Sequence, residues 1–218
     1  MTRRIRRQLM IGSAIVGALL LVTVGFLTLG GQGAERTTES AQLDMRGNPV
    51  QLDPGVTPSA AVTRRMQVTP STGKRLVIPS VGLNVPLGAL NVVDNTITPP
   101  GFTSAYLVRN LGAHLTTPDA GTVYVVAHAI RGGGVAPGNY LADLATHSAR
   151  VSVGAEISAA GVTYRVTGVE SVNKTALPTD RSVWTNTPNR LVIVTCLERA
   201  DGKPATDNLV VYATRTGP

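Results

Sequence analysis

The chain has 218 residues, of which 15% are charged and 4% aromatic, and its mean hydropathy is +0.13. This composition excludes a highly charged disordered chain and a multi-span membrane protein, and the length suits one globular domain with accessory segments. The single cysteine, Cys196, excludes intramolecular disulfides, CxxC redox motifs and paired-cysteine zinc sites. The net charge of +7 does not indicate a polyanionic partner, because arginines crowded into positions 3–7 supply four of the 20 cations.

A long apolar segment follows these arginines. Residues 9–29 contain no ionisable side chain, and at ~1.5 Å per residue a helix over them crosses the ~30 Å hydrocarbon core of a bilayer. We predict that residues 1–8 are a basic cytoplasmic N-terminus and that residues 9–30 are a single-pass transmembrane signal anchor in the cell membrane. A cleaved signal peptide is the alternative, although its apolar region is usually shorter, at ~7–15 residues. With either a signal anchor or a cleaved signal peptide, the rest of the chain is expected to be exported from the cytoplasm.

The next segment, residues 31–73, is rich in Gly, Pro, Thr, Ser and Gln and shows no apolar periodicity. It offers too little apolar surface to offset the entropy of ordering it, so we predict a flexible extracellular linker. Residues 74–218 are then the predicted folded domain. The domain consists of short β-rich runs separated by Gly, Pro and Asn.

The β-rich runs predict an all-β fold. The predicted strands cover residues 76–78, 85–90, 122–127, 150–158, 162–172, 190–196 and 208–214. Residues 140–148 predict a short helix, because Leu141 and Leu144 are three positions apart. Closing the sheet removes exposed edges, so we expect a closed barrel of seven to eight strands with short helices, preceded by one N-terminal transmembrane helix.

Two predicted strands end on residues that can carry chemistry. The apolar run 191–195 leads into Cys196, and the apolar run 123–127 leads into His128, which a glycine-rich loop follows. A thiol and an imidazole can form a nucleophile and acid/base pair if the fold brings them together. Taken singly, a lone cysteine is more often a small core residue, and a histidine at a strand end is more often a satisfied polar residue.

Three segments, in order, resemble sortases, the surface-protein transpeptidases of Gram-positive bacteria. The run 190–196, which ends in Thr195 and Cys196, resembles the sortase signature strand, and the run 121–128 resembles the strand that ends on the catalytic histidine. The run 75–83 is similar to the opening strand of the family. The likeness covers about residues 74–213; it is class E/F-like, and the residues do not fix the class. It implies a sortase-type barrel in which Cys196 is the nucleophile and His128 the general acid/base.

The resemblance also implies a reaction. Sortases cleave a sorting motif similar to Leu-Pro-x-Thr-Gly between Thr and Gly, and they pass the acyl group to an amine. The implied partners are a sorting-signal peptide of secreted surface proteins, an amine acceptor on a peptidoglycan precursor or a pilin, and the membrane. Thr195 is the expected substrate-binding neighbour of the nucleophile. Composition and residue spacing indicate no cofactor, no metal and no nucleic acid.

The sequence departs from the family at one position. Sortases carry an arginine near the start of the last strand, whereas residues 204–213 contain none, and the slot falls on Thr206 or Asn208. Asn208 can donate an uncharged hydrogen bond to an oxyanion, and Arg199 is a candidate cation from the neighbouring loop. A non-catalytic barrel that binds surface peptides is therefore an alternative function, as is a Cys–His hydrolase that releases an acid.

Overall fold

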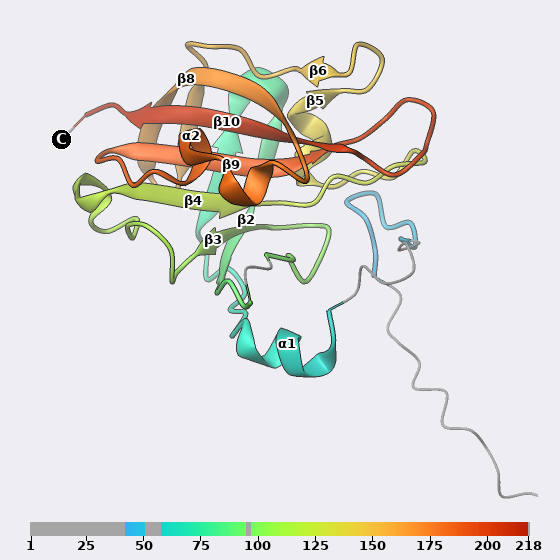
Figure 1. Cartoon of the computed structure of the whole chain (residues 1–218), viewed down its shortest axis with the longest axis horizontal. Helices are drawn as coiled ribbons and strands as arrows, with labels where there is room; N and C mark the ends of the chain where they lie inside the picture. The colour runs from blue at the N-terminus through green and yellow to red at the C-terminus, as the bar shows by residue number, and fades with distance from the viewer. Residues whose placement is uncertain (1–41, 51–57, 95–96, 218) are drawn as a thin grey trace, which may run out of the picture. The chain divides into compact units, whose positions relative to one another are not determined.

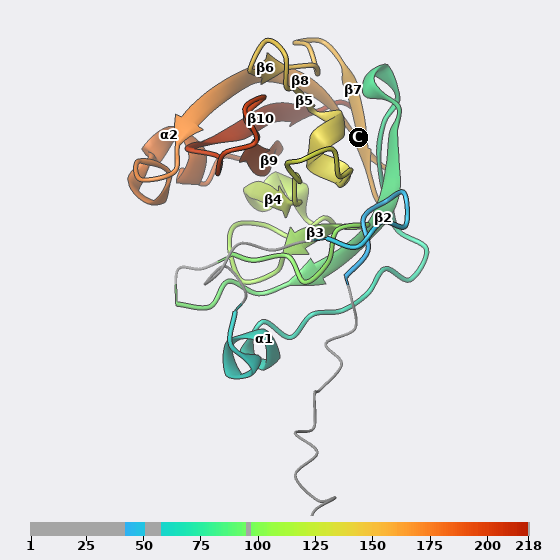
Figure 2. The ribbon, with the colours of Figure 1, turned by 90° about the vertical axis from the view of Figure 1, so that its right-hand side faces the viewer.

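The computed structural model describes residues 42–50, 58–94 and 97–217, and its main feature is a closed β-barrel (Figures 1 and 2). The strand order is β1-β2-β3-β4-β9-β10-β8-β7, and β7 closes the barrel by pairing with β1. The strands are β1 (Arg75–Ile78), β2 (Leu83–Leu90), β3 (Ala105–Val108), β4 (Thr122–Val126), β7 (Glu156–Ala159), β8 (Val162–Asn173), β9 (Arg190–Leu197) and β10 (Asp207–Arg215). The predicted closed barrel is confirmed, with eight strands.

Short elements connect the barrel strands or precede them. A small hairpin lies apart from the barrel and is formed by β5 (Ala142–Asp143) and β6 (Ser148–Ala149). The helices of the described chain are α1 (Ala60–Arg65), α2 (Arg181–Trp184) and the 3₁₀ helices η1 (Pro79–Val81), η2 (Pro118–Ala120), η3 (Pro137–Tyr140) and η4 (Leu177–Thr179). In the view of Figure 1, α2 lies over the strands β9 and β10.

The side chains of the central strands β4, β9 and β10 alternate between two apolar layers. On β4, Val123 and Val125 belong to the inner core, to which all eight barrel strands contribute. Tyr124 and Val126 instead belong to a second cluster, which we call the outer layer. The outer layer also contains Val192, Val194 and Val210 of β9 and β10, Tyr106 and Val108 of β3, and Val183 of α2. The face of β4, β9 and β10 outside the barrel is therefore covered by α2.

Two sequence predictions within the domain are wrong. Residues 140–148 do not form a helix, because the Asp143 carboxylate accepts hydrogen bonds from the backbone N–H groups of Ala145 and Thr146, at 2.9 and 3.2 Å. These bonds make the turn of the β5–β6 hairpin. Residues 150–155 do not form a strand, because Gly154 takes a left-handed φ of +90° and the strand starts only at Glu156.

Secondary structure is also present before residue 74, where we predict that the folded domain begins. Helix α1 begins after Ser59, whose hydroxyl accepts the N–H of Val62, and Thr69 bridges to Ala89 of β2. No helix among the described residues is long and apolar enough to cross a membrane. The predicted transmembrane segment, residues 9–30, lies outside the described residues.

Residues 42–50 form a strap that is bound to the loop after His128. The buried Asp44 carboxylate accepts the backbone N–H groups of Arg46, Asn48 and Val135 at 2.8 to 3.0 Å, and the Met45 N–H donates to the Val135 carbonyl. Burial raises the pKa of Asp44, but these hydrogen bonds outweigh burial and lower the pKa to about 2. The charged carboxylate is thus the group that holds the strap.

Replacing Asp44 by asparagine is expected to release the strap at neutral pH. The folded pKa lies below the ordinary value, so the carboxylate contributes its full stabilisation above pH ~4 and loses it only as the pH falls through about 2. Trypsin cleavage after Arg46, followed by mass spectrometry, should accelerate about tenfold in the variant. Asp119→Asn on the exposed η2 is the control. Equal cleavage rates in wild type and Asp44→Asn would contradict this role.

Candidate active site

Strands β4 and β9 bring His128 and Cys196 into register. The two strands are parallel, with Val126 opposite Val194, and the Ala127 N–H continues the ladder to the Val194 carbonyl at 3.2 Å. Continuing this register by two residues puts His128, just after β4, opposite Cys196 near the end of β9. Parallel neighbours are about 4.8 Å apart, and residues two positions after Val126 and Val194 share their outward face. The two residues that sequence analysis singled out thus lie side by side.

The ring of His128 is held by the loop between β2 and β3. Its Nε2 atom is 2.8 Å from the carbonyl oxygen of Pro99, and the Phe102 ring stacks on it with a centroid distance of 4.5 Å. Because a carbonyl oxygen only accepts, Nε2 carries the hydrogen and donates it. The neutral ring therefore keeps its lone pair on Nδ1, which is the nitrogen left to take up a proton.

The backbone at His128 is fixed by η3. The N–H of Gly138 donates to the His128 carbonyl at 2.8 Å, and the Asn139 side chain bonds both the N–H and the carbonyl of Ile130. A β-carbon at Gly138 would lie only 2.8 Å from the His128 carbonyl oxygen and 1.9 Å from the Thr195 hydroxyl oxygen. Only glycine fits between these two atoms, so the loop after β4 is closely packed.

Burial moves the pKa values of His128 and Cys196 apart. It lowers the pKa of His128, which the hydrogen bond with Pro99 opposes in part. Burial raises the pKa of the half-buried Cys196 thiol. The positive charge of Lys174 opposes this increase, and the negative charge of Glu198 adds to it. Between the two values the pair holds one proton, mainly as a neutral thiol beside a neutral imidazole.

The other predicted site residues lie on different sides of Cys196. Asn208 of β10 is directly opposite Cys196 in the antiparallel pair and is buried, so these two are brought together. Thr195 points to the inner side, where its hydroxyl is buried against Gly138 without a hydrogen-bond partner among the described residues. This orientation differs from the substrate contact that the sequence suggested, because consecutive strand residues face opposite ways.

Arg199 lies in the loop after β9. Its guanidinium binds the Asp201 carboxylate through two hydrogen bonds of 3.0 and 2.7 Å. A paired guanidinium of this kind is engaged with its own loop. The groups that sequence analysis missed are Glu198 and Lys174, both of which act electrostatically on Cys196. Because side chains alternate along a strand, Glu198 lies on the same face as Cys196 and could have been found from the sequence. No local sequence pattern connects Lys174 with β9.

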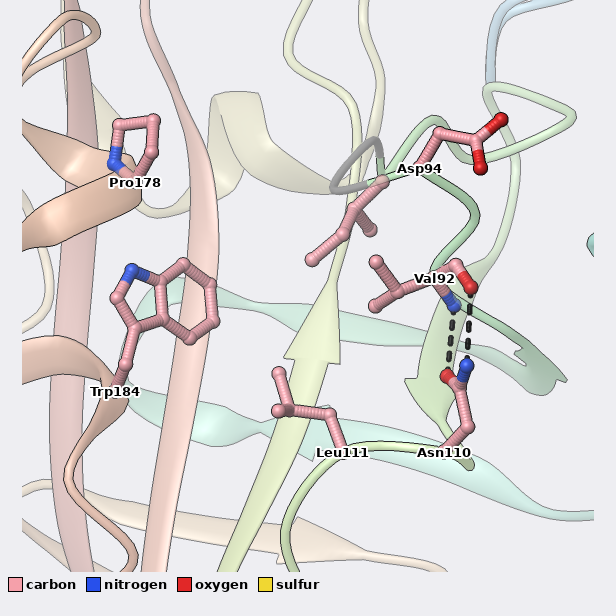
Figure 3. Close-up of a pocket in the computed structure, with 7 residues that line it drawn as sticks. Val92, Asp94, Asn110, Leu111, Pro178 and Trp184 are labelled. Atoms are coloured by element: carbon pink, nitrogen blue, oxygen red, sulfur yellow. Dashed lines mark hydrogen bonds between the residues drawn. The ribbon is translucent and has the colours of Figure 1, made fainter.

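A cavity of about 510 Å³ lies beside the outer layer (Figure 3). Its lining residues are Val92, Asp94, Ile97, Asn110, Leu111, Pro178 and Trp184. The Asn110 amide makes two hydrogen bonds with the backbone of Val92, at 2.8 and 3.0 Å, and so joins two walls of the cavity. Ile97, Leu111 and Trp184 pack against the same outer layer as Val126 and Val194, two residues before His128 and Cys196.

No group of three or more His, Cys, Asp or Glu side chains within residues 42–50, 58–94 and 97–217 has the arrangement of a metal site. The reactive groups in this part of the chain are of a different type. The registers of β4, β9 and β10 bring a thiol, an imidazole and an amide donor to one edge of the barrel. This arrangement suits nucleophilic attack on a carbonyl carbon with proton transfer through the imidazole.

Comparison with known proteins found similar solved structures, whereas no family model and no curated protein matches the chain. Sortase A of Listeria monocytogenes is 19% identical, with a TM-score of 0.47 over 66% of this chain and 86% of that chain. A lid mutant of sortase A from Corynebacterium diphtheriae is 17% identical, with a TM-score of 0.47 over 69% and 73% of the two chains. Sortase C-1 from Streptococcus pneumoniae is 15% identical, with a TM-score of 0.44 over 66% and 67%.

Proposed function

We propose that this protein is a membrane-anchored cysteine transpeptidase of the sortase type. It cleaves a Leu-Pro-x-Thr-Gly-like sorting signal between Thr and Gly and transfers the acyl group to an amine of a peptidoglycan precursor or a pilin. The observation that carries the proposal is the parallel register of β4 and β9, which, continued two residues beyond Val126 and Val194, puts His128 opposite Cys196. The sequence motifs that end on these two residues supply the reaction type.

In the first step, Nδ1 of His128 takes the thiol proton and Sγ of Cys196 attacks the Thr carbonyl carbon. The C–N bond to Gly breaks, and the departing amine takes the proton from the imidazolium, which leaves a thioester on Cys196. In the second step, the acceptor amine attacks the thioester carbon and the C–S bond breaks. The proton lost by the amine returns through His128 to the sulfur, so that the new amide and the free thiol complete the cycle.

The neighbouring groups have distinct roles in this proposal. Asn208, buried opposite Cys196, is our candidate for the hydrogen bond to the carbonyl oxygen as it gains negative charge. Arg199 can assist only after it leaves Asp201. The cavity beside Trp184 is the proposed site for the apolar residues of the sorting signal, because apolar side chains of the outer layer form part of its lining.

The proposal includes the membrane. The arginines at positions 3–7 and the apolar residues 9–29 support a single-pass anchor with a cytoplasmic N-terminus and an extracellular barrel. Anchoring the barrel at the surface would present it to secreted proteins as they leave the membrane.

The test is a product analysis with the full-length protein in detergent. A fluorescence-quenched Leu-Pro-x-Thr-Gly peptide is incubated with and without triglycine, and the products are identified by mass spectrometry. We expect release of the Gly-terminal fragment and ligation of triglycine to the threonyl carboxyl group. Release of only the free acid when triglycine is present would favour the Cys–His hydrolase. Binding of the peptide without any cleavage would favour the non-catalytic barrel.

A further inference from the structure

The strand register places two charged residues beside Cys196. β9 and β8 both pair with β10, and Asn208 lies opposite Cys196 on one side and Val172 on the other. The Lys174 N–H extends the ladder with a bond to the Thr206 carbonyl at 2.9 Å. Continuing both registers by two residues gives a second row on the same face, Glu198–Thr206–Lys174. Lys174 and Glu198 therefore flank Thr206, one step beyond the row of Cys196.

The geometry lets the Lys174 ammonium reach the thiol. Two strand spacings of ~4.8 Å separate the backbones of Lys174 and Glu198, and only the short Thr206 side chain stands between them. The four-carbon stem of a lysine crosses such a gap. The positive charge of Lys174 lowers the pKa of the Cys196 thiol and that of the Glu198 carboxylate, both of which burial raises.

Glu198 explains why the ammonium stays at this position. Its side chain is only 7% exposed, and burial raises its pKa, which the charges of Lys174 and Arg131 oppose. A buried carboxylate is costly unless a cation pairs with it. The negative charge of Glu198 thus attracts Lys174 toward this end of β9, on the side of Cys196 away from β4. Arg199, the cation nearest in sequence, is bound to Asp201 instead.

We propose that Lys174 is the catalytic cation of this site, and that its ammonium, held by Glu198, stabilises the Cys196 thiolate during attack on the substrate. The role deepens the proposed function and rests on it. Attack requires the thiolate, and a half-buried thiolate needs a positive charge nearby. β10 offers only the neutral Asn208 at the position opposite Cys196, so the charge comes from the end of β8 instead.

The test is the pH dependence of Cys196 alkylation in the full-length protein in detergent. Iodoacetamide is uncharged, and the chain has 1 cysteine, so intact mass reports this thiol alone. Lys174→Met should raise the apparent pKa of the thiol by about one unit and slow alkylation at pH 7.5 about tenfold. Lys174→Arg should stay within about twofold of wild type, as should the control Lys74→Met, one residue before β1.

Two outcomes would overturn the proposal. One is an alkylation profile of Lys174→Met that matches wild type, and the other is an equal change in Lys74→Met. Lys174 is exposed, so its replacement leaves the core intact, and the melting temperature checks this. Alkylation needs no sorting peptide. If wild type fails to cleave the peptide but Lys174→Met still shifts the profile, the transpeptidase proposal fails while the coupling of Lys174 to Cys196 stands.

Discussion

Replacing Cys196 by alanine is expected to abolish peptide cleavage, with a loss on the order of 10⁴-fold or more in kcat/KM. No other thiol is present in the chain, so no second residue can form the thioester. Cys196→Ser should be almost equally inactive, because a serine hydroxyl at this position is a far weaker nucleophile near neutral pH than a thiolate. The measurement is the initial rate of cleavage of the quenched peptide.

Stability is the control for these two variants. Cys196 is half-buried on the outward face of β9 and takes no part in the inner core, so Cys196→Ser should melt within a few degrees of wild type. A folded Cys196→Ala protein that cleaves the peptide within tenfold of the wild-type rate would refute the role of Cys196 as nucleophile.

His128→Asn is expected to lower kcat/KM by about 10²- to 10⁴-fold, the usual contribution of a positioned acid/base group. In wild type, kcat/KM should follow a broad bell-shaped pH curve. Its acid limb lies below pH ~6.5, because burial lowers the pKa of His128, and its alkaline limb lies above pH ~9, because burial raises the pKa of Cys196. The acid limb should be absent from the residual activity of His128→Asn.

His114 provides the matched control, since it is exposed in the loop after β3. His114→Asn should keep both the rate and the pH curve of wild type. If His128→Asn retained the wild-type curve, or if the acid limb lay above pH 7, the group that titrates would be another residue and the assignment of His128 would be wrong.

Local sequence patterns predicted the strands that carry His128 and Cys196. Both strands are apolar on both faces because α2 and its loops cover the outside of β4 and β9, and this continuous apolar pattern is readable without a structure. The same patterns failed at residues 140–148, where the side-chain bonds of Asp143 replace helical ones. Helix spacing alone does not reveal such competition.

The residue that supplies a cation beside Cys196 could be identified only from the fold. Lys174 and Cys196 come together only through the pairing of β8 and β9 with β10, and no spacing in the sequence encodes that register. The loop residue Arg199 is closer to Cys196 along the chain, yet its neighbour Asp201 binds it. The orientation of Thr195 follows from strand alternation, but the presence of Gly138 beneath its hydroxyl depends on the path of η3.

The central claim is that Cys196 forms a thioester with the sorting peptide. Its most direct test is intact-mass spectrometry of the full-length protein, quenched with acid during turnover of a Leu-Pro-x-Thr-Gly peptide without an added amine. We expect a mass increase equal to the peptide up to its threonine, located on Cys196 by digestion and removed by hydroxylamine. Cys196→Ala protein quenched in the same way should show no mass increase. Peptide cleavage without any adduct on Cys196 would contradict the account.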